Sequence, residues 1–107
     1  MITIIAGSRD ITDFNLVEMA INESKFNVTC IVSGCARGVD FLGEQYAIKN
    51  QLPITRFPAN WKKHGKSAGH KRNKEMAENA EALIAIWNGT SSGTKNMIEE
   101  AKKRNLK

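Results

Sequence analysis

Short apolar runs rich in β-branched residues alternate with segments of helical spacing along the whole of this 107-residue chain. Four such runs occur, at residues 2–6, 29–32, 54–57 and 82–87. Strands that are apolar on both faces and separated by helices form a parallel sheet covered on both sides. A chain this short supplies one hydrophobic core. The pattern therefore predicts a single α/β domain over residues 1–107, a small Rossmann-like doubly wound sheet of about four parallel strands with helices on both faces.

The segments between the runs carry apolar residues three or four positions apart, which is the spacing of one helix face. The first such segment places Phe14, Val17 and Ile21 on one face, and the second does the same with Val39 and Leu42. Two later helices are expected around Met76–Ala80 and Thr94–Ala101, after a long connection over residues 59–68. No repeat or linker interrupts this order.

Composition and targeting patterns exclude several classes of protein. No stretch approaches the roughly 20 apolar residues that a membrane-spanning helix needs. The first apolar run lacks a basic leader and meets Arg9 and Asp10 almost at once, so no signal peptide is expected. Cys30 and Cys35 do not form a disulfide framework in such a chain. We therefore expect a cytoplasmic protein, in a bacterium or an infected host cell, with no membrane partner.

Glycine-rich turns follow three of the four expected strands and open a helix each time. They are Gly7-Ser8-Arg9, the segment 33–40 (SGCARGVD) and the segment 88–94 (NGTSSGT). In parallel α/β sheets the ligand lies beyond the carboxyl ends of the strands. Glycine lets backbone amides approach an anion, and a helix N-terminus adds unpaired N–H groups. The three turns predict a phosphate-bearing ligand. None of them ends in Gly-Lys-Ser/Thr, which argues against an ATPase.

The positive charge is concentrated in one part of the chain. Sixteen basic and eleven acidic residues give a net charge of +5. Eight of the basic residues and no acidic residue lie between Gln45 and Lys74, so the rest of the chain is net acidic. One interpretation is a solvated basic face. The other is a lid that brings Lys66 and Arg72 over the anion, since arginine binds phosphate in bidentate fashion.

Two tryptophans and four possible metal ligands are the remaining residues that suggest a ligand site. Trp61, in the basic connection, is either a stacking platform for a base or an anchor of its loop, whereas Trp87 continues an apolar strand and is expected in the core. Two cysteines and two histidines are spaced loosely like a zinc site, but one cysteine lies inside an apolar strand. We expect neither a metal nor a cofactor. The cysteines and histidines with this loose zinc-like spacing are Cys30, Cys35, His64 and His70.

The ordered motifs resemble those of a known family. The three glycine turns, together with the segments 57–61 (FPANW), 65–69 (GKSAG) and Arg72-Asn73, are similar to the YspA/YpsA-like branch of the SLOG superfamily, a Rossmann-like group common in phages and bacterial conflict genes. The resemblance spans nearly the whole chain and implies binding of a nucleotide or nucleotide-derived signal. The expected ligand-binding residues are Gly7, Ser8, Arg9, Ser33, Gly34, Ala36, Arg37, Gly38, Asp40, Trp61, Lys66, Arg72, Asn73, Asn88, Gly89, Thr90, Ser91, Gly93 and Thr94.

The chain departs from the LOG-type phosphoribohydrolases of the same superfamily at the catalytic position. Arg72 and Met76 fit their first motif and Gly93-Thr94 fits part of the second, but Met97 stands where that motif has glutamate. Cleavage through a ribosyl cation needs a carboxylate near the anomeric carbon. The candidates for a catalytic role are Arg72, Asp40 and Glu100. The resemblance therefore favours ligand binding over turnover.

Three functions remain open. The first is a non-catalytic binder that senses or sequesters a nucleotide-derived signal, such as a cyclic ADP-ribose or a cyclic oligonucleotide, in a phage anti-defence role. The second is an N-glycosidic hydrolase acting on a nucleotide. The third is a nucleic-acid-binding protein, against which the single tyrosine and the lack of an aromatic-rich strand argue. Relatives continue into a fifth strand, so an uncovered sheet edge here predicts a homo-oligomer.

Overall fold

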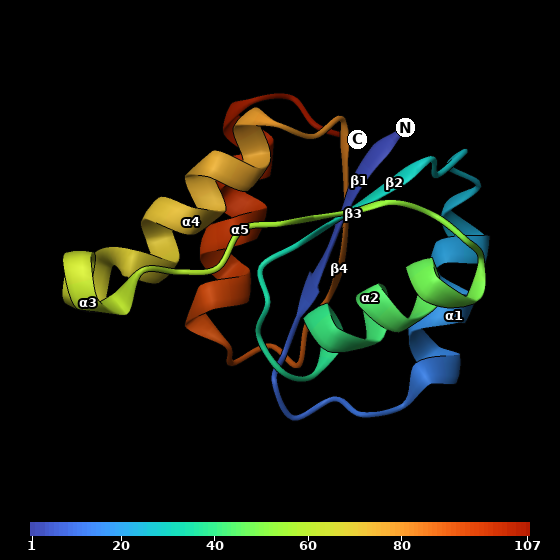
Figure 1. Ribbon diagram of the computed structural model, residues 1–107, viewed down its shortest axis with the longest axis horizontal. Helices are drawn as coiled ribbons and strands as arrows, with labels where there is room; N and C mark the ends of the chain where they lie inside the picture. Colours follow the sequence, from blue (N-terminus) through green and yellow to red (C-terminus); the bar gives the residue numbers. More distant parts are fainter.

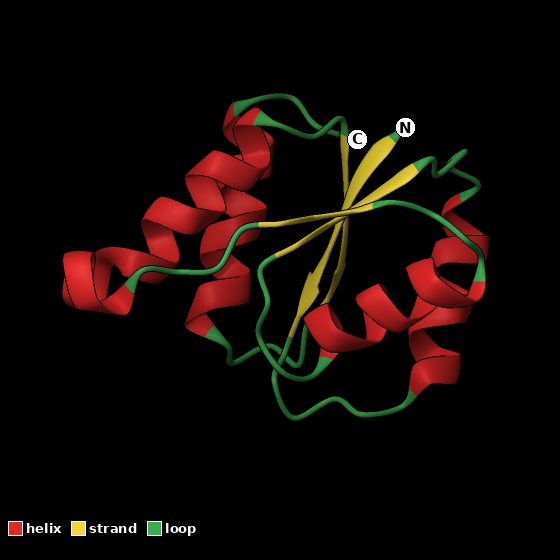
Figure 2. Ribbon diagram, in the orientation of Figure 1, coloured by secondary structure: helices red, strands yellow, loops and turns green.

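The computed structural model describes the backbone of residues 1–107 and every side chain except that of Lys66. It contains four strands in the order β3-β2-β1-β4, and all neighbouring pairs are parallel. Helices cover both faces of the sheet, with α1 and α2 on one side and α4 and α5 on the other (Figure 1, Figure 2). The predicted Rossmann-like α/β fold is therefore confirmed. The elements are β1 (Ile2–Gly7), α1 (Phe14–Ser24), β2 (Cys30–Ser33), α2 (Val39–Lys49), β3 (Ile54–Arg56), α3 (Trp61–His64), the 3₁₀ turn η1 (Gly65–Ser67), α4 (Ala68–Glu78), β4 (Ala82–Ile86) and α5 (Ser92–Lys103).

The core has two halves because neighbouring residues of a strand point to opposite faces of the sheet. In β1, Ile5 packs with Val17 and Leu42 under α1 and α2. Its neighbour Ile4 packs on the other face with Met76 and Met97, from α4 and α5. All of these side chains are buried. Continuous apolar strands are thus required here, since each strand serves both halves of the core.

The order of strands reverses beside β1, where the chain moves from β3 at one edge to β4 on the far side. A reversal of this kind creates a crevice at the carboxyl ends of the central strands, where ligands of doubly wound sheets bind. Gly7 and Ile86, the last residues of β1 and β4, are partners in the ladder at this point. The fold therefore directs attention to the turns after β1, β2 and β4.

The connection after β3 is more ordered than the sequence suggests. The long connection expected over residues 59–68 contains α3 and η1. The side chain of Asn60 caps α3 by accepting a hydrogen bond from the amide of Lys63 at 3.1 Å. We missed this helix because it is four residues long and buries none of its side chains, so it leaves no apolar periodicity.

The outer edge of β4 is partly covered by the end of the chain. The amide of Lys107 donates to the carbonyl of Glu81 at 3.2 Å, and the amide of Leu83 donates to the carbonyl of Lys107 at 2.9 Å. This is the hydrogen-bonding pattern of a parallel neighbour strand. Self-association through a sheet edge stays a prediction. None of the helices in the described residues has the length and apolar character needed to cross a membrane.

Candidate functional site

Three adjoining cavities open at the carboxyl edge of the sheet, and all three are lined by Arg9 and Arg72. The innermost has a volume of about 60 Å³ and lies between the end of β1, the start of α2 and the start of α5. The other two, of about 490 Å³ and 150 Å³, lie on either side of Trp61. We call the three together the Arg9–Arg72 cleft. Residues lining the innermost cavity are Ala6, Gly7, Arg9, Ala36, Asp40, Arg72, Asn73, Met76, Ser91, Gly93, Thr94 and Met97.

The guanidinium of Arg72 is held in place from two sides. Its Nη1 donates to the carbonyl of Gly34, and its Nε donates to Oδ1 of Asn73 at 2.9 Å. A Cβ at Gly34 would lie 2.6 Å from Nη1, so only glycine allows the guanidinium to approach the β2–α2 turn this closely. Burial lowers the pKa of Arg72, while nearby Asp40 raises it. An arginine remains charged at neutral pH under these conditions, so a fixed positive charge faces the cleft.

Asn73 connects this arginine to the start of α5. The residue is 3% exposed, and its side-chain amide donates to the carbonyl of Gly93 at 3.1 Å and to Oδ1 of Asn96 at 2.9 Å. Its own Oδ1 accepts from Arg72. One buried side chain thus sets the distance between the guanidinium and the N-terminus of α5.

Asp40 lies in the first turn of α2 and lines the innermost cavity. The side chain is buried, and Oδ2 accepts a hydrogen bond from the amide of Ala36 at 3.3 Å. Burial raises the pKa of Asp40 to about 6, an effect that the Ala36 amide and the charge of Arg72 oppose. The carboxylate is therefore mostly ionised at pH 7.5, at a cost in free energy that its surroundings do not fully offset.

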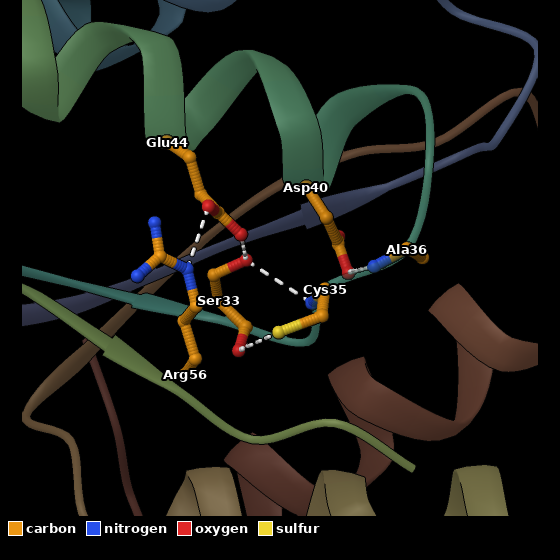
Figure 3. A network of polar contacts seen from close by, with 6 residues as sticks. All are labelled: Ser33, Cys35, Ala36, Asp40, Glu44 and Arg56. Carbon is orange, nitrogen blue, oxygen red and sulfur yellow. Dashed lines mark hydrogen bonds and ion pairs between the residues drawn. The ribbon is translucent and has the colours of Figure 1, made fainter.

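A polar network holds the turn between β2 and α2 (Figure 3). The hydroxyl of Ser33 donates to Oε2 of Glu44 at 2.6 Å and accepts from the amide of Cys35 at 3.1 Å. Oε1 of Glu44 accepts from Nε of Arg56 in β3 at 2.9 Å. Glu44 and Asp40, one turn apart on α2, thus hold the β2–α2 turn at two points. Cys35 adopts a left-handed conformation with φ of 64°, and burial raises the pKa of its thiol.

The turn after β1 is tied to both neighbouring turns by Ser8. This residue is 1% exposed; its hydroxyl accepts from the amide of Asn88 at 3.0 Å, and its carbonyl accepts from the amide of Val39 at 3.3 Å. A Cβ at Gly38, where φ is +76°, would lie 2.5 Å from the Ser8 carbonyl oxygen. Ser8 and Gly38 therefore hold the turns that form the cleft, and neither residue lines it.

The turn after β4 presents the N-terminus of α5 to the cleft. Oδ1 of Asn88 accepts from the amides of Thr90 and Ser91, at 2.9 and 3.1 Å. The hydroxyl of Ser91 caps the helix by accepting from the amide of Thr94 at 3.4 Å. Within the described contacts, the amides of Ser92 and Gly93 have no acceptor. Free amides at the start of a helix favour an anion.

Trp87 corrects one expectation of the sequence. Core packing was predicted for it, but the side chain is 42% exposed and lies just beyond β4. Its indole N–H donates to the carbonyl of Ser91 at 3.0 Å, which supports the turn. The strand ends one residue earlier than its apolar run because the chain must turn toward α5 at this point.

The basic segment contributes only part of its charge to the cleft. Arg72 and Trp61 line it, and Trp61 is 53% exposed, with its ring edge 3.6 Å from the position of a Cβ on Gly69. The predicted role of Lys66 concerns a side chain outside the described residues. Four other lysines line none of the three cavities: Lys62, Lys63, Lys71 and Lys74.

The structure brings most of the predicted residues to the cleft and separates a few from it. Twelve of them line it: Gly7, Arg9, Gly34, Ala36, Asp40, Trp61, Arg72, Asn73, Thr90, Ser91, Gly93 and Thr94. Four others hold the turns around the cleft without lining it: Ser8, Ser33, Gly38 and Asn88. Arg37 and Gly89 neither line the cleft nor hold its turns. Glu100 lies outside the cavities, and its carboxylate pairs with Arg104 at 2.6 Å and Lys103 at 3.5 Å.

Two residues at motif positions lie deeper in the site than their spacing alone indicates: Met76 and Met97 form the apolar floor of the innermost cavity. Glu44, which supports the β2–α2 turn, looks in the sequence like any other polar helix residue. No group of three or more His, Cys, Asp or Glu side chains capable of holding a metal ion is found among the described residues.

Two proteins of phage origin are similar in sequence to this chain. The "Gene 61 protein" of Mycobacterium phage D29 is 35% identical over 82 residues, covering 71% of this chain and 66% of that protein. An uncharacterised SPbeta prophage-derived protein of Bacillus subtilis strain 168, YoqJ, is 32% identical over 63 residues, covering 59% of this chain and 32% of that protein.

The chain therefore spans less than two thirds of the length of either relative. No solved structure matches it. Residues 1–64, from β1 to the end of α3, match the family described as "YspA, cpYpsA-related SLOG family". The matched segment contains the turns after β1 and β2 with Arg9 and Asp40, and on this match the chain belongs to the YspA, cpYpsA-related SLOG family.

Proposed function

We propose that the protein binds a nucleotide or nucleotide-derived small molecule through a phosphate group in the Arg9–Arg72 cleft. The observation that carries the proposal is the convergence of Arg9, the fixed Arg72 and the free amides at the start of α5 on one small cavity at the point where strand order reverses. Each of these groups favours an anion, and together they surround a volume suited to a single phosphate group.

The rest of the ligand has room on either side of Trp61. Its indole borders both outer cavities and is half exposed, so a base can stack on it. The hydroxyls of Thr90 and Ser91 line the larger of the two cavities and offer hydrogen-bonding groups to a polar ligand. This arrangement supports a ligand that carries both a phosphate and a base.

In this proposal the protein acts without turnover, in the cytoplasm, as a sensor or a sequestering protein for a nucleotide-derived signal. Phage and prophage relatives are consistent with an anti-defence role that removes such a signal. A cyclic ADP-ribose or a cyclic oligonucleotide fits the chemistry of the cleft. Apolar Met97 on the floor of the cavity, in place of a carboxylate, favours binding over cleavage.

Equilibrium dialysis against a panel of nucleoside monophosphates, ADP-ribose derivatives and cyclic dinucleotides tests the proposal. At least one compound is expected to bind, and chromatography after heat denaturation is expected to recover it unchanged. Arg72→Gln should abolish this binding. Lys74→Gln is the matched control, because it removes a positive charge from an exposed position on α4 that lines no cavity. Binding lost equally in both variants would contradict the proposed site.

Asp40 favours a second candidate function, hydrolysis of an N-glycosidic bond. Its carboxylate lies in the same cavity as Arg72, where it could stabilise a ribosyl cation. This candidate predicts free base among the products of the same incubation, and loss of product formation in Asp40→Asn. Quantitative recovery of intact ligand after prolonged incubation would exclude it.

A further inference from the structure

The innermost cavity has one side that can only accept hydrogen bonds. Asp40 is 6% exposed, yet the single hydrogen bond described for its carboxylate is the one from the Ala36 amide to Oδ2 (Figure 3). No buried polar side-chain atom in the described structure lacks a partner. Oδ1 of Asp40, for which no donor is described, must therefore reach the open space of the cavity that Asp40 lines.

Groups next to Asp40 donate hydrogen bonds, because a Cβ on Gly34 would lie 2.8 Å from Asp40 Oδ2 and 2.6 Å from Arg72 Nη1. Of the three guanidinium nitrogens of Arg72, Nη1 and Nε are engaged by Gly34 and Asn73, whereas Nη2 has no acceptor among the described hydrogen bonds. Arg9 and Gly93 line the same cavity, Ser92 lines the adjoining one, and the amides of Ser92 and Gly93 have no acceptor among the described hydrogen bonds. A phosphate fits these donors, but a second phosphate directed at Asp40 would be repelled by its charge.

The contacts of the Asp40 carboxylate do not explain why a charged group is buried here. Its carboxylate has no ion-pair partner within 4.0 Å among the described residues, and its one hydrogen bond, at 3.3 Å, is long. A group that only capped the β2–α2 turn would gain from being neutral in this buried position. The open oxygen thus calls for a hydrogen-bond donor on the ligand, close to its phosphate.

We propose that Asp40 accepts hydrogen bonds from the sugar hydroxyls of the ligand and makes the cleft selective for ribose over 2-deoxyribose. The inference rests on the proposed function, and it narrows the ligand to a ribose phosphate. Hydroxyl groups on a five-membered sugar lie close to its 5-phosphate, so one ligand can reach both Asp40 and the donors that line the same cavity. A site that offers a charged acceptor to a hydroxyl rejects an analogue without that hydroxyl, because the acceptor is then left unpaired.

Amide NMR titrations at pH 7.5 with three base-free probes test this inference: ribose 5-phosphate, 2-deoxyribose 5-phosphate and inorganic phosphate. The wild-type protein is expected to bind ribose 5-phosphate about tenfold or more tightly than 2-deoxyribose 5-phosphate, since a hydrogen bond to a charged group is worth at least that factor. Asp40→Ala should reduce this ratio to less than about twofold while binding inorganic phosphate at least as well.

Asp40→Asn is a second variant that keeps an acceptor for the Ala36 amide and should give a ratio between these two. Glu18→Gln is the control, since it removes one negative charge from α1 at an exposed pair with Lys49. It should leave the ratio unchanged. Equal binding of the two sugar phosphates by the wild type, or an unchanged ratio in Asp40→Ala, would overturn the inference alone. Failure of all three probes to bind would overturn the proposed function together with it.

Discussion

The two sides of the Arg9–Arg72 cleft differ in how tightly they are held. On the inner wall, formed by residues 33–40, a Cβ at Gly34 would lie 2.8 Å from Asp40 Oδ2, and one at Gly38 would lie 2.5 Å from the Ser8 carbonyl oxygen. On the outer wall, formed by α3 and the start of α5, a Cβ at Gly93 would meet nothing within 4 Å. Close packing fixes the first wall, and the second has space around it.

This contrast indicates a division of labour. A tightly held wall can place Asp40, and the Arg72 guanidinium that donates to its Gly34 carbonyl, accurately against the parts that all ribose phosphates share. An open wall beside the exposed Trp61 can accommodate bases of different size. We therefore expect substitutions on the inner wall to change stability and binding together, whereas substitutions on the outer wall should change binding alone.

The largest expected effect comes from comparing one glycine of each wall, Gly38 on the inner wall and Gly93 on the outer wall. Gly38→Ala places a Cβ against the Ser8 carbonyl at a φ of +76°, so we expect a loss of about 3 kcal/mol or more in the free energy of unfolding. Gly93→Ala, in the first turn of α5, should be neutral or stabilising by up to about 1 kcal/mol. Urea denaturation measures both. Similar losses in the two variants would remove the contrast between the walls.

The next effect concerns the charge of Asp40. Its pKa rises from the ordinary 3.8 to about 6 on folding, so the folded state holds its proton to higher pH than the unfolded state. The stability contributed by this group is full below pH 4 and is lost as the pH rises through 6, by roughly 3 kcal/mol. Asp40→Asn should therefore be more stable than the wild type at pH 7.5 by up to that amount.

The same comparison at pH 3.5 should show a much smaller difference, because Asp40 is then protonated in the folded state and mostly protonated in the unfolded state. Thermal unfolding of the two proteins across this pH range provides the measurement. A wild type that is the more stable of the two at pH 7.5 would mean that Arg72 outweighs burial at this site.

A smaller effect is expected from Glu44, which supports the inner wall through Ser33. Glu44→Gln weakens the 2.6 Å hydrogen bond and the ion pair with Arg56, and we expect a loss of about 1 kcal/mol. Glu18→Gln breaks an exposed ion pair of similar length and should cost about 0.5 kcal/mol or less. If the two variants lose the same stability, Glu44 is an ordinary surface residue.

The smallest change in stability is expected on the outer wall. Trp61→Ala removes a half-exposed side chain from a four-residue helix and should change the free energy of unfolding by about 0.5 kcal/mol or less. Binding of a nucleoside monophosphate should weaken about tenfold, since stacking of one base is worth at least 1 kcal/mol. Inorganic phosphate should bind unchanged. A parallel loss for both ligands would place Trp61 in the anion site instead.

The sequence was sufficient for the fold because its apolar runs record a constraint shared by every strand. Ile4 and Ile5 must both be apolar, since each faces a different half of the core. The glycine turns were equally visible in the sequence. The structure brings the turns after β1 and β4 together, because Gly7 and Ile86 are partners in the ladder.

Details of the site that depend on side-chain contacts could not be predicted. Nothing in the spacing of Asn73 and Asn96 indicates that they meet across α4 and α5. Trp87 has the sequence context of a buried residue and lies exposed, because the chain leaves the sheet one position earlier. Glu100 was a candidate because it is close in sequence to Met97, but on α5 its carboxylate forms an ion pair with Arg104.

A crystal structure with adenosine 5′-monophosphate tests the central claim most directly. Our account predicts the phosphate between Arg9, the guanidinium of Arg72 and the amides of Ser92 and Gly93, with the ribose hydroxyls toward Asp40. A phosphate bound instead on the exposed lysines of α3 and α4, with the cleft empty, would contradict it.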